Sequence, residues 1–346
     1  SLITGTITIA AVSSVSGALL QNFPLFSSFH HINLAIAILV ISGWILILGK
    51  YKALDRISKF LVALLTLLTF FAVVSLLLKG SINQALDISW IKPNDSPWKF
   101  SNLGFLIPLM GWMPCPLELC VWPSLWMFSR SKDSEYVPNV KEAEFDFNLG
   151  YIITVITAIF FLTLGAITMY EVGDGMLSGI QGSFAKKLII LYTESIGDWS
   201  KWIIIPASFA AMFSTTITCL DAYPRSISAI QGLLKGTDLG HLDSKVERNR
   251  FQNWMIVHIF VSIIALLIAK SYLLTFKQFL FAATSGSFLT APLFAWMAMD
   301  TINSNLVPVQ NRYGSFLTTL CWIGLFFLII FSFLYIANSF FGIGIS

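Results

Sequence analysis

The sequence predicts an all-α protein that crosses a membrane several times as a bundle of helices. Hydrophobic residues make up 56% of the 346 positions and charged residues only 11%, whereas a soluble domain carries about 25% charged residues. So few charges cannot cover a surface that faces water, and the mean hydropathy of +0.78 gives the same indication. We therefore expect lipid to surround most of the molecule.

Nine apolar runs of membrane-spanning length divide the sequence. A helix needs about 20 mostly apolar residues to cross the hydrocarbon layer of a bilayer. The runs lack the alternating pattern of membrane strands and exceed their length of about 10 residues, so helices are expected. The predicted spans are residues 2–20, 32–49, 60–78, 103–128, 149–170, 202–220, 254–269, 278–298 and 315–340.

The basic residues predict how these spans are oriented. Of the 21 Lys and Arg residues, 13 lie in the connections that follow the second, fourth, sixth and eighth spans. Cytoplasmic connections of membrane proteins are enriched in Lys and Arg. These four connections are therefore expected inside, with Ser1 in the cytoplasm and Ser346 outside. The longer ones, at 130–148 and 221–253, carry both charge signs and are typical of amphipathic surface helices or loops.

Several classes of function are disfavoured by what the sequence contains. The net charge of +3 is spread over many short clusters, so a nucleic-acid partner is not expected. The four cysteines form no CxxC pair, and the sequence has no HExxH motif and no nucleotide-binding glycine motif. We expect neither an enzyme nor a bound cofactor. The chain starts at Ser1 within an apolar run that lacks a signal peptide's features, which favours an N-terminal truncation.

The fourth span is interrupted at its centre by two prolines one residue apart. Pro114 and Pro116 lack the amide hydrogens that would bond the carbonyl groups of Met110 and Trp112. An unbonded carbonyl in hydrocarbon costs several kcal/mol, so such backbone is tolerated only inside protein or beside a wet cavity. Discontinuous helices of this kind form cation and substrate sites in secondary transporters. A simple proline kink is the alternative.

Chemically reactive side chains surround this break. Glu118 is a carboxylate deep in an apolar span, where it usually faces a cavity, a partner or an ion path. Met113, Cys115 and Cys120 add sulfur atoms, which suit transition metals better than magnesium or calcium. The structural alternatives are a hydrogen-bonded glutamate and ordinary packing of Met and Cys. We predict a metal site at the break.

The chain resembles the natural-resistance-associated macrophage protein (Nramp) family of divalent metal transporters. The motif Met110–Pro114, followed by the charged loop 130–146, is similar to the family's sixth span and the loop after it. The resemblance continues through Phe145–Leu149, Ser214–Thr218 and Gln278–Leu293. It implies an inverted-repeat bundle of the leucine-transporter type in one transporter domain over residues 1–346. It also implies proton-coupled import of manganese or iron, with the family's first two spans absent here.

The resemblance assigns roles to individual residues near the break. Met113 corresponds to the family's thioether ligand, and Met110 would offer its carbonyl oxygen to the metal. Cys115 and Cys120 occupy positions where the family has histidines, and cysteines carry protons poorly at neutral pH. Thr284 is nearest to the family's metal-facing glutamine. The family's Asp-Pro-Gly-Asn motif, in the absent first span, has no counterpart.

The predicted function is secondary active transport of a divalent metal ion across a bilayer, and the expected location is the inner membrane of a bacterium. Glu118 stands where the family has an uncharged residue, and it could accept protons or bind the metal. An added carboxylate also suits a harder ion such as magnesium. A carrier of a small organic solute such as an amino acid remains open, as do a transport-inactive receptor and a membrane-embedded enzyme.

Overall fold

The computed structural model describes residues 2–48, 51–78, 103–113, 115–134, 136–169, 188–190, 192–193, 195–236, 245–272, 276–305 and 307–341. Within these ranges the chain forms α-helices and short 3₁₀ turns, and no strand is present. The prediction of an all-α protein is therefore confirmed.

Seven helices in the described ranges are long and apolar enough to cross a membrane. They are α1 (Leu2–Leu20), α2 (His31–Leu48), α7 (Val140–Met169), α9 (Lys201–Leu234), α10 (Lys245–Ser271), α11 (Phe276–Asn303) and α12 (Ser315–Phe341). The apolar part of α3 (Tyr51–Leu78) is shorter and begins at Val62. The protein is thus a multi-pass helical membrane protein.

The helices extend further than their apolar runs. The expected connection 221–253 is mostly helical, because α9 continues to Leu234 and α10 already begins at Lys245. Charged side chains support this extension. The Arg225 guanidinium donates two hydrogen bonds to the Asp221 carboxylate, of 2.6 and 3.0 Å, one helical turn apart. A hydropathy window detects only the part of a helix that lies in hydrocarbon.

Helix α7 likewise begins well before its apolar run. Asn139 precedes the helix, and its side-chain oxygen accepts a hydrogen bond of 3.0 Å from the Glu142 backbone N–H. The Glu142 carboxylate accepts one of the same length from the Asn139 backbone N–H. This reciprocal pair satisfies two amide groups that the first helical turn leaves without intrahelical partners. Part of the connection 130–148, for which a surface helix or a loop was expected, is therefore helix.

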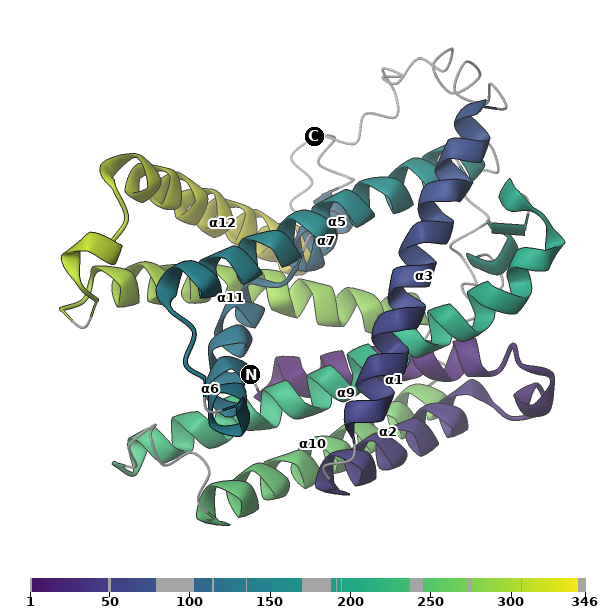
Figure 1. Ribbon diagram of the computed structural model, residues 1–346, viewed down its shortest axis with the longest axis horizontal. Coiled ribbons are helices and arrows are strands. Elements are labelled where there is room, and N and C mark those ends of the chain that lie inside the picture. The colour runs from purple at the N-terminus through teal and green to yellow at the C-terminus, as the bar shows by residue number, and fades with distance from the viewer. Residues whose placement is uncertain are drawn as a thin grey trace. The chain divides into compact units, whose positions relative to one another are not determined.

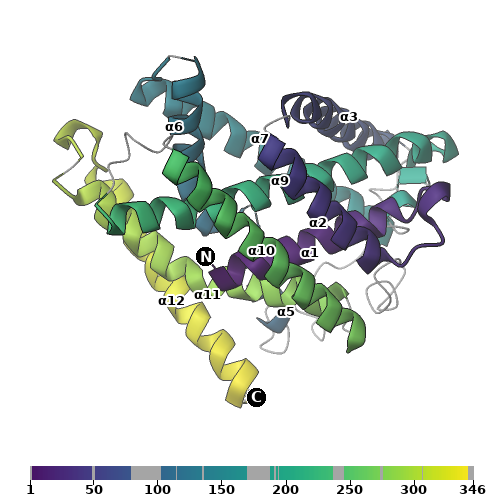
Figure 2. The ribbon, with the colours of Figure 1, turned by 90° about the horizontal axis from the view of Figure 1, so that it is seen from below.

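The helices fall into two compact units. The first comprises Ser1–Ile88 and Ser124–Leu280, and the second comprises Ser89–Pro123 and Phe281–Ser346. Helix α1 is the most buried of the seven membrane-length helices in the described ranges, and it packs against α2, α9 and α10 of the first unit. Figures 1 and 2 show α1 enclosed by these helices, with α10 crossing both α1 and α2.

Small and hydroxyl-bearing residues allow the neighbours of α1 to approach closely. A β-carbon at Gly17 would overlap the backbone of α2 at the His31 carbonyl oxygen. The Ser16 and Thr216 hydroxyl groups form a hydrogen bond of 3.1 Å between α1 and α9. Membrane helices have little hydrophobic drive to associate, so close packing and such hydrogen bonds hold them together.

A second layer of the first unit contains α3 and α7. The Thr69 hydroxyl of α3 and the Tyr192 hydroxyl form a buried hydrogen bond of 2.7 Å. Around this pair, Leu164 of α7 and Ile204 of α9 are fully buried. The layer thus joins segments that lie more than a hundred residues apart in sequence.

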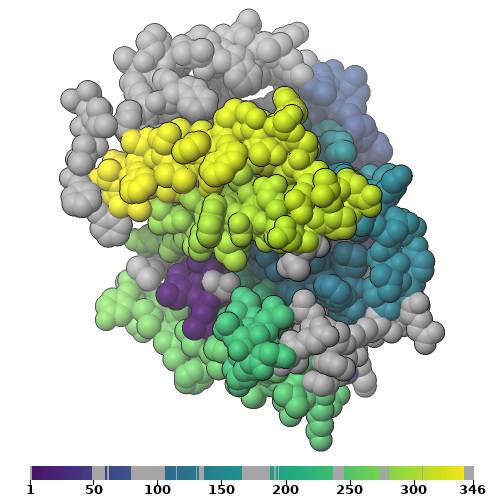
Figure 3. Space-filling model, turned by 90° about the vertical axis from the view of Figure 1, so that its left-hand side faces the viewer, coloured from purple at the N-terminus to yellow at the C-terminus, as the bar shows by residue number. Residues whose placement is uncertain are grey.

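The second unit is built on the pair of α11 and α12. The Ser285 hydroxyl of α11 forms a hydrogen bond of 2.7 Å with the Tyr335 hydroxyl of α12. Nearby, the buried Phe288 packs with Ile107 of helix α5 (Leu103–Trp112) and with Phe331 of α12. Helix α12 lies on the face of the molecule seen in Figure 3. Many of its apolar side chains are exposed, as expected for a surface that faces lipid.

We expect Gly17→Ala to destabilise the protein, because the added methyl group would push α1 and α2 apart. Overpacking of this kind costs about 1–3 kcal/mol, and it would lower the midpoint of thermal unfolding in detergent. Gly324→Ala is the matched control, since no atom lies within 4 Å of a β-carbon at Gly324, also a helical glycine. Equal melting midpoints for the two variants would contradict the close packing of α1 on α2.

Candidate functional site

The predicted break in the fourth span is present. Helix α5 ends at Trp112, and the Met113 backbone N–H still bonds the Leu109 carbonyl over 3.1 Å. Pro116 is extended, with φ −61° and ψ 137°, and it precedes the 3₁₀ helix η3 (Leu117–Val121) and helix α6 (Trp122–Ser134). Pro114 lies outside the described residues. The span is therefore two helical pieces separated by non-helical backbone.

Helix α5 touches α11 directly just before the break. A β-carbon at Gly111 would overlap the carbonyl oxygen of Thr284 and crowd the Phe288 side chain. Only glycine allows this distance between the two backbones. Thr284, a predicted site residue of α11, therefore lies next to the helix that leads into the predicted break.

A chain of hydrogen bonds joins the two sides of the break through α11. The Trp112 indole N–H donates to the Ser287 hydroxyl oxygen over 3.1 Å. The Ser287 hydroxyl in turn donates to the Glu118 carboxylate over 3.3 Å. Trp112 ends α5 and Glu118 belongs to η3, so one serine of α11 connects both pieces of the broken span.

Glu118 is the buried acidic group of this site. Only 5% of its surface is exposed. A carboxylate removed from water is costly unless hydrogen-bond donors or a cation compensate its charge. The Ser287 hydroxyl supplies one such donor. The arrangement can therefore hold a proton or a cation at Glu118, close to backbone that is not helical.

The other predicted site residues differ in their surroundings. Thr284 is buried, and its hydroxyl donates to the Phe281 carbonyl of its own helix over 3.2 Å. Cys115 is half-buried. Met113 is 46% exposed. Across the described ranges, no group of three or more His, Cys, Asp or Glu side chains is arranged to hold a metal ion.

Met110 has a packing role in addition to its predicted ligand role. Its half-buried side chain packs against Ile107 and Phe288. The metal role predicted for Met110 concerns its carbonyl oxygen, and the packing of the side chain has no bearing on that role. Met113, by contrast, is an exposed residue of the second unit.

Two residues of the site were not among the predicted candidates. Ser287 and Trp112 carry the hydrogen bonds across the break. A signal for Ser287 was present in the sequence, because it follows Thr284 by three residues and such residues share one face of a helix. For Trp112 the sequence offered only its position beside the break.

No family model matches the chain. The chain is similar to an uncharacterized protein of Pasteurella multocida strain Pm70, with 31% identity over 306 residues. The matched region covers 88% of this chain and 66% of that protein, so the chain spans just under two thirds of its relative's length. The name of that protein assigns it no activity, and the chemistry of this chain must be argued from its own residues.

We expect Ser287→Ala to loosen the second unit. The substitution would remove the acceptor of the Trp112 indole and a donor to the buried Glu118 carboxylate, and a buried polar group without its partner costs about 1–3 kcal/mol. The thermal unfolding midpoint should fall. Ser271→Ala is the matched control, because the Ser271 hydroxyl is exposed and bonds only within its own helix turn. No difference between the variants would contradict the bridge.

Proposed function

We propose that the protein is a secondary active transporter of divalent metal ions of the manganese and iron class. The observation that carries the proposal is the broken span, with the buried Glu118 tied to α11 through Ser287. Non-helical backbone inside a membrane is tolerated where it lines a cavity or is packed in protein, and ion sites of transporters use such breaks. A buried carboxylate beside the break supplies charge for a cation.

The finer architecture belongs to the same proposal. We infer nine spans, in which α3 and the broken segment join the seven membrane-length helices, arranged as an inverted-repeat bundle of the leucine-transporter type. The resemblance to the Nramp family at Met110–Pro114 supports this inference. We also propose that residues 1–346 form one transporter domain. The proposed location is the inner membrane of a bacterium, and protons are the proposed co-substrate.

A harder cation such as magnesium is the second candidate cargo. Two oxygen groups at the break could contact a cation, the Glu118 carboxylate and the Ser287 hydroxyl. Oxygen ligands favour magnesium, calcium or manganese, whereas thioether and thiolate sulfur favours softer metals. Met113 presents its sulfur at an exposed position. Competition between manganese and magnesium for uptake separates the two candidates.

Glu118→Gln tests the proposed site directly. We expect metal uptake into proteoliposomes, measured with a metal-quenched dye, to fall about tenfold or more, since removal of groups that support a metal site typically costs 10–100-fold. Glu144→Gln is the control, because Glu144 is exposed on α7.

Uptake by Glu118→Gln at the wild-type rate would contradict a role for this carboxylate. Uptake of an amino acid in place of metal would favour the organic-solute carrier, and absence of any uptake by the wild type would favour a receptor-like protein. Neither outcome requires enzymatic activity, and a non-enzymatic role remains a prediction.

Met113→Ala tests whether sulfur takes part in metal selection. If the thioether is a ligand, the half-saturating concentration of manganese should rise about tenfold, which corresponds to ~1.4 kcal/mol, and that of magnesium should change less. Met297→Ala is the control, since Met297 is an exposed methionine of α11. Equal changes for both metals would favour an oxygen-only site.

A further inference from the structure

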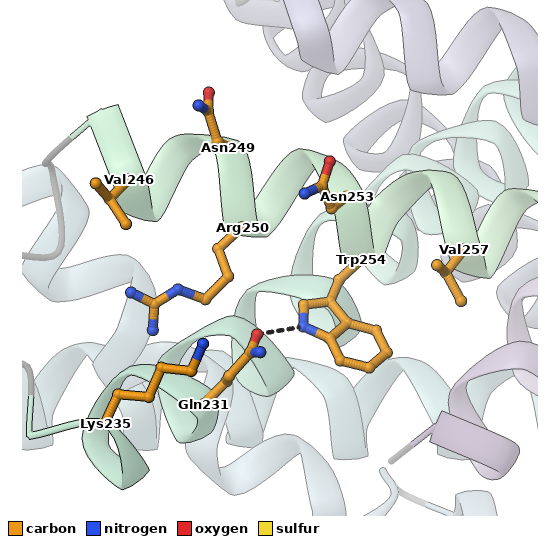
Figure 4. A pocket seen from close by; sticks show the side chains of 8 residues that line it. All are labelled: Gln231, Lys235, Val246, Asn249, Arg250, Asn253, Trp254 and Val257. Atoms are coloured by element: carbon orange, nitrogen blue, oxygen red, sulfur yellow. Dashed lines mark hydrogen bonds between the residues drawn. The ribbon is translucent and has the colours of Figure 1, made fainter.

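An open pocket of about 520 Å³ lies where α9 ends and α10 begins, away from the candidate metal site. Its lining includes Lys235 from the end of α9 and Arg250 and Trp254 from α10. Figure 4 shows the Arg250 and Trp254 side chains reaching toward α9, while Lys235 points back toward α10. Two cationic groups therefore face one pocket whose lining contains no acidic residue.

The position of Lys235 is fixed by the way α9 ends. The Lys235 backbone N–H bonds the Gly232 carbonyl over 3.0 Å, and Gly236 follows with a φ of 72°. This left-handed conformation is readily adopted by glycine and terminates a helix. The helix end consequently fixes the backbone position from which the Lys235 side chain lines the pocket.

The charge of the Arg250 guanidinium is partly neutralised by Glu247. Its Nη2 atom forms an ion pair of 2.5 Å with the Glu247 carboxylate, one turn earlier on α10. Its Nη1 atom is buried and has no acceptor among the described residues. Gly232 of α9 makes room for this pair, because a β-carbon there would lie 2.9 Å from Nη1. The guanidinium therefore keeps hydrogen-bonding capacity that the described residues do not satisfy, on a side chain that lines the pocket.

From Arg250 onward, the α10 lining of the pocket changes from charged to apolar. Val246 and Asn249 precede Arg250, Asn253 and Trp254 follow it, and Val257 comes last. The Trp254 indole is oriented by a hydrogen bond of 2.9 Å to the Gln231 side-chain oxygen, drawn as a dashed line in Figure 4. The same order of charge, amide, tryptophan and aliphatic residue is found on passing from water into the bilayer.

We propose that this pocket binds the phosphate of an anionic phospholipid from the cytoplasmic leaflet. Lys235 and Arg250 would bind the phosphate oxygens, and the apolar end at Val257 would contact the glycerol and the start of an acyl chain. The Lys and Arg distribution places this connection on the cytoplasmic side. Basic pockets between membrane helices on that side suit anionic headgroups.

A lipid fits the pocket better than a free phosphate ion does. The lining is largely apolar apart from its two cations and its amide groups, so a small hydrated anion would leave the Trp254 and Val257 side uncovered. An amphiphile covers both parts at once. This pocket is independent of the proposed transport, because none of its residues belongs to the broken span.

The test compares lipid binding by the detergent-solubilised full chain in native mass spectrometry, with phosphatidylglycerol or phosphatidylcholine added. We expect phosphatidylglycerol to bind more tightly, and Lys235→Gln to weaken its binding about fivefold, as expected for one basic residue near a membrane surface. Arg248→Gln is the matched control. It removes one positive charge from the same end of α10, but Arg248 is exposed and does not line the pocket.

A second variant removes the other pocket cation together with its ion-pair partner, so that weaker binding is not caused by an unpaired buried charge. The double change Glu247→Gln and Arg250→Gln removes the pocket cation without leaving a buried carboxylate unpaired, and it should also weaken phosphatidylglycerol binding about fivefold or more. Equal weakening by Arg248→Gln would overturn the proposal, since only general surface charge would then matter. Displacement of the lipid by millimolar inorganic phosphate would identify a free-phosphate site instead and would also overturn it.

Discussion

In a bilayer no water is available for a backbone N–H or C=O group that leaves a helix, and this constraint bears on the break in the predicted fourth span. The chain leaves its helix after Trp112 and becomes helical again at Leu117. Around this gap, α11 comes so close that Gly111 meets its backbone, and Ser287 binds groups on both sides. The broken span is thus held in place by a neighbouring helix rather than by its own hydrogen bonds.

Both units use hydroxyl groups to join helices. Ser16 with Thr216, Thr69 with Tyr192 and Ser285 with Tyr335 are pairs between different helical segments. A hydroxyl can satisfy itself on its own helix when no partner is present, so it costs less in an apolar interior than an amide or a charge does. Glu118 differs from these groups because a buried carboxylate is costly unless donors or a cation compensate its charge, and its own helical backbone alone does not supply them.

The apolar runs alone could predict the existence of the helices but not their ends. Composition reports how much of a helix lies in hydrocarbon, whereas the ends of α9, α10 and α7 depend on local hydrogen bonds such as the pair between Asn139 and Glu142. The break was predictable because two prolines remove specific amide hydrogens.

The site was predictable only in part. Glu118 and Thr284 were singled out from their chemistry, and both are buried in the second unit. The bond between Ser287 and Glu118 joins positions 169 residues apart, and no local pattern encodes such a distance. The exposure of Met113 likewise depends on how α5, α11 and α12 pack, which a single sequence does not specify.

The burial of α1 also has a consequence for the order of assembly. Its serines and threonines face other helices, and the Ser16 hydroxyl finds its partner on α9, 200 residues later in the chain. Long-range contacts of this kind form slowly, because the intervening chain must be ordered first. During synthesis the Ser16 hydroxyl therefore lacks its Thr216 partner until α9 has been inserted. The packing of α1 is therefore complete only after α9 and α10, which lie late in the chain, have joined the first unit.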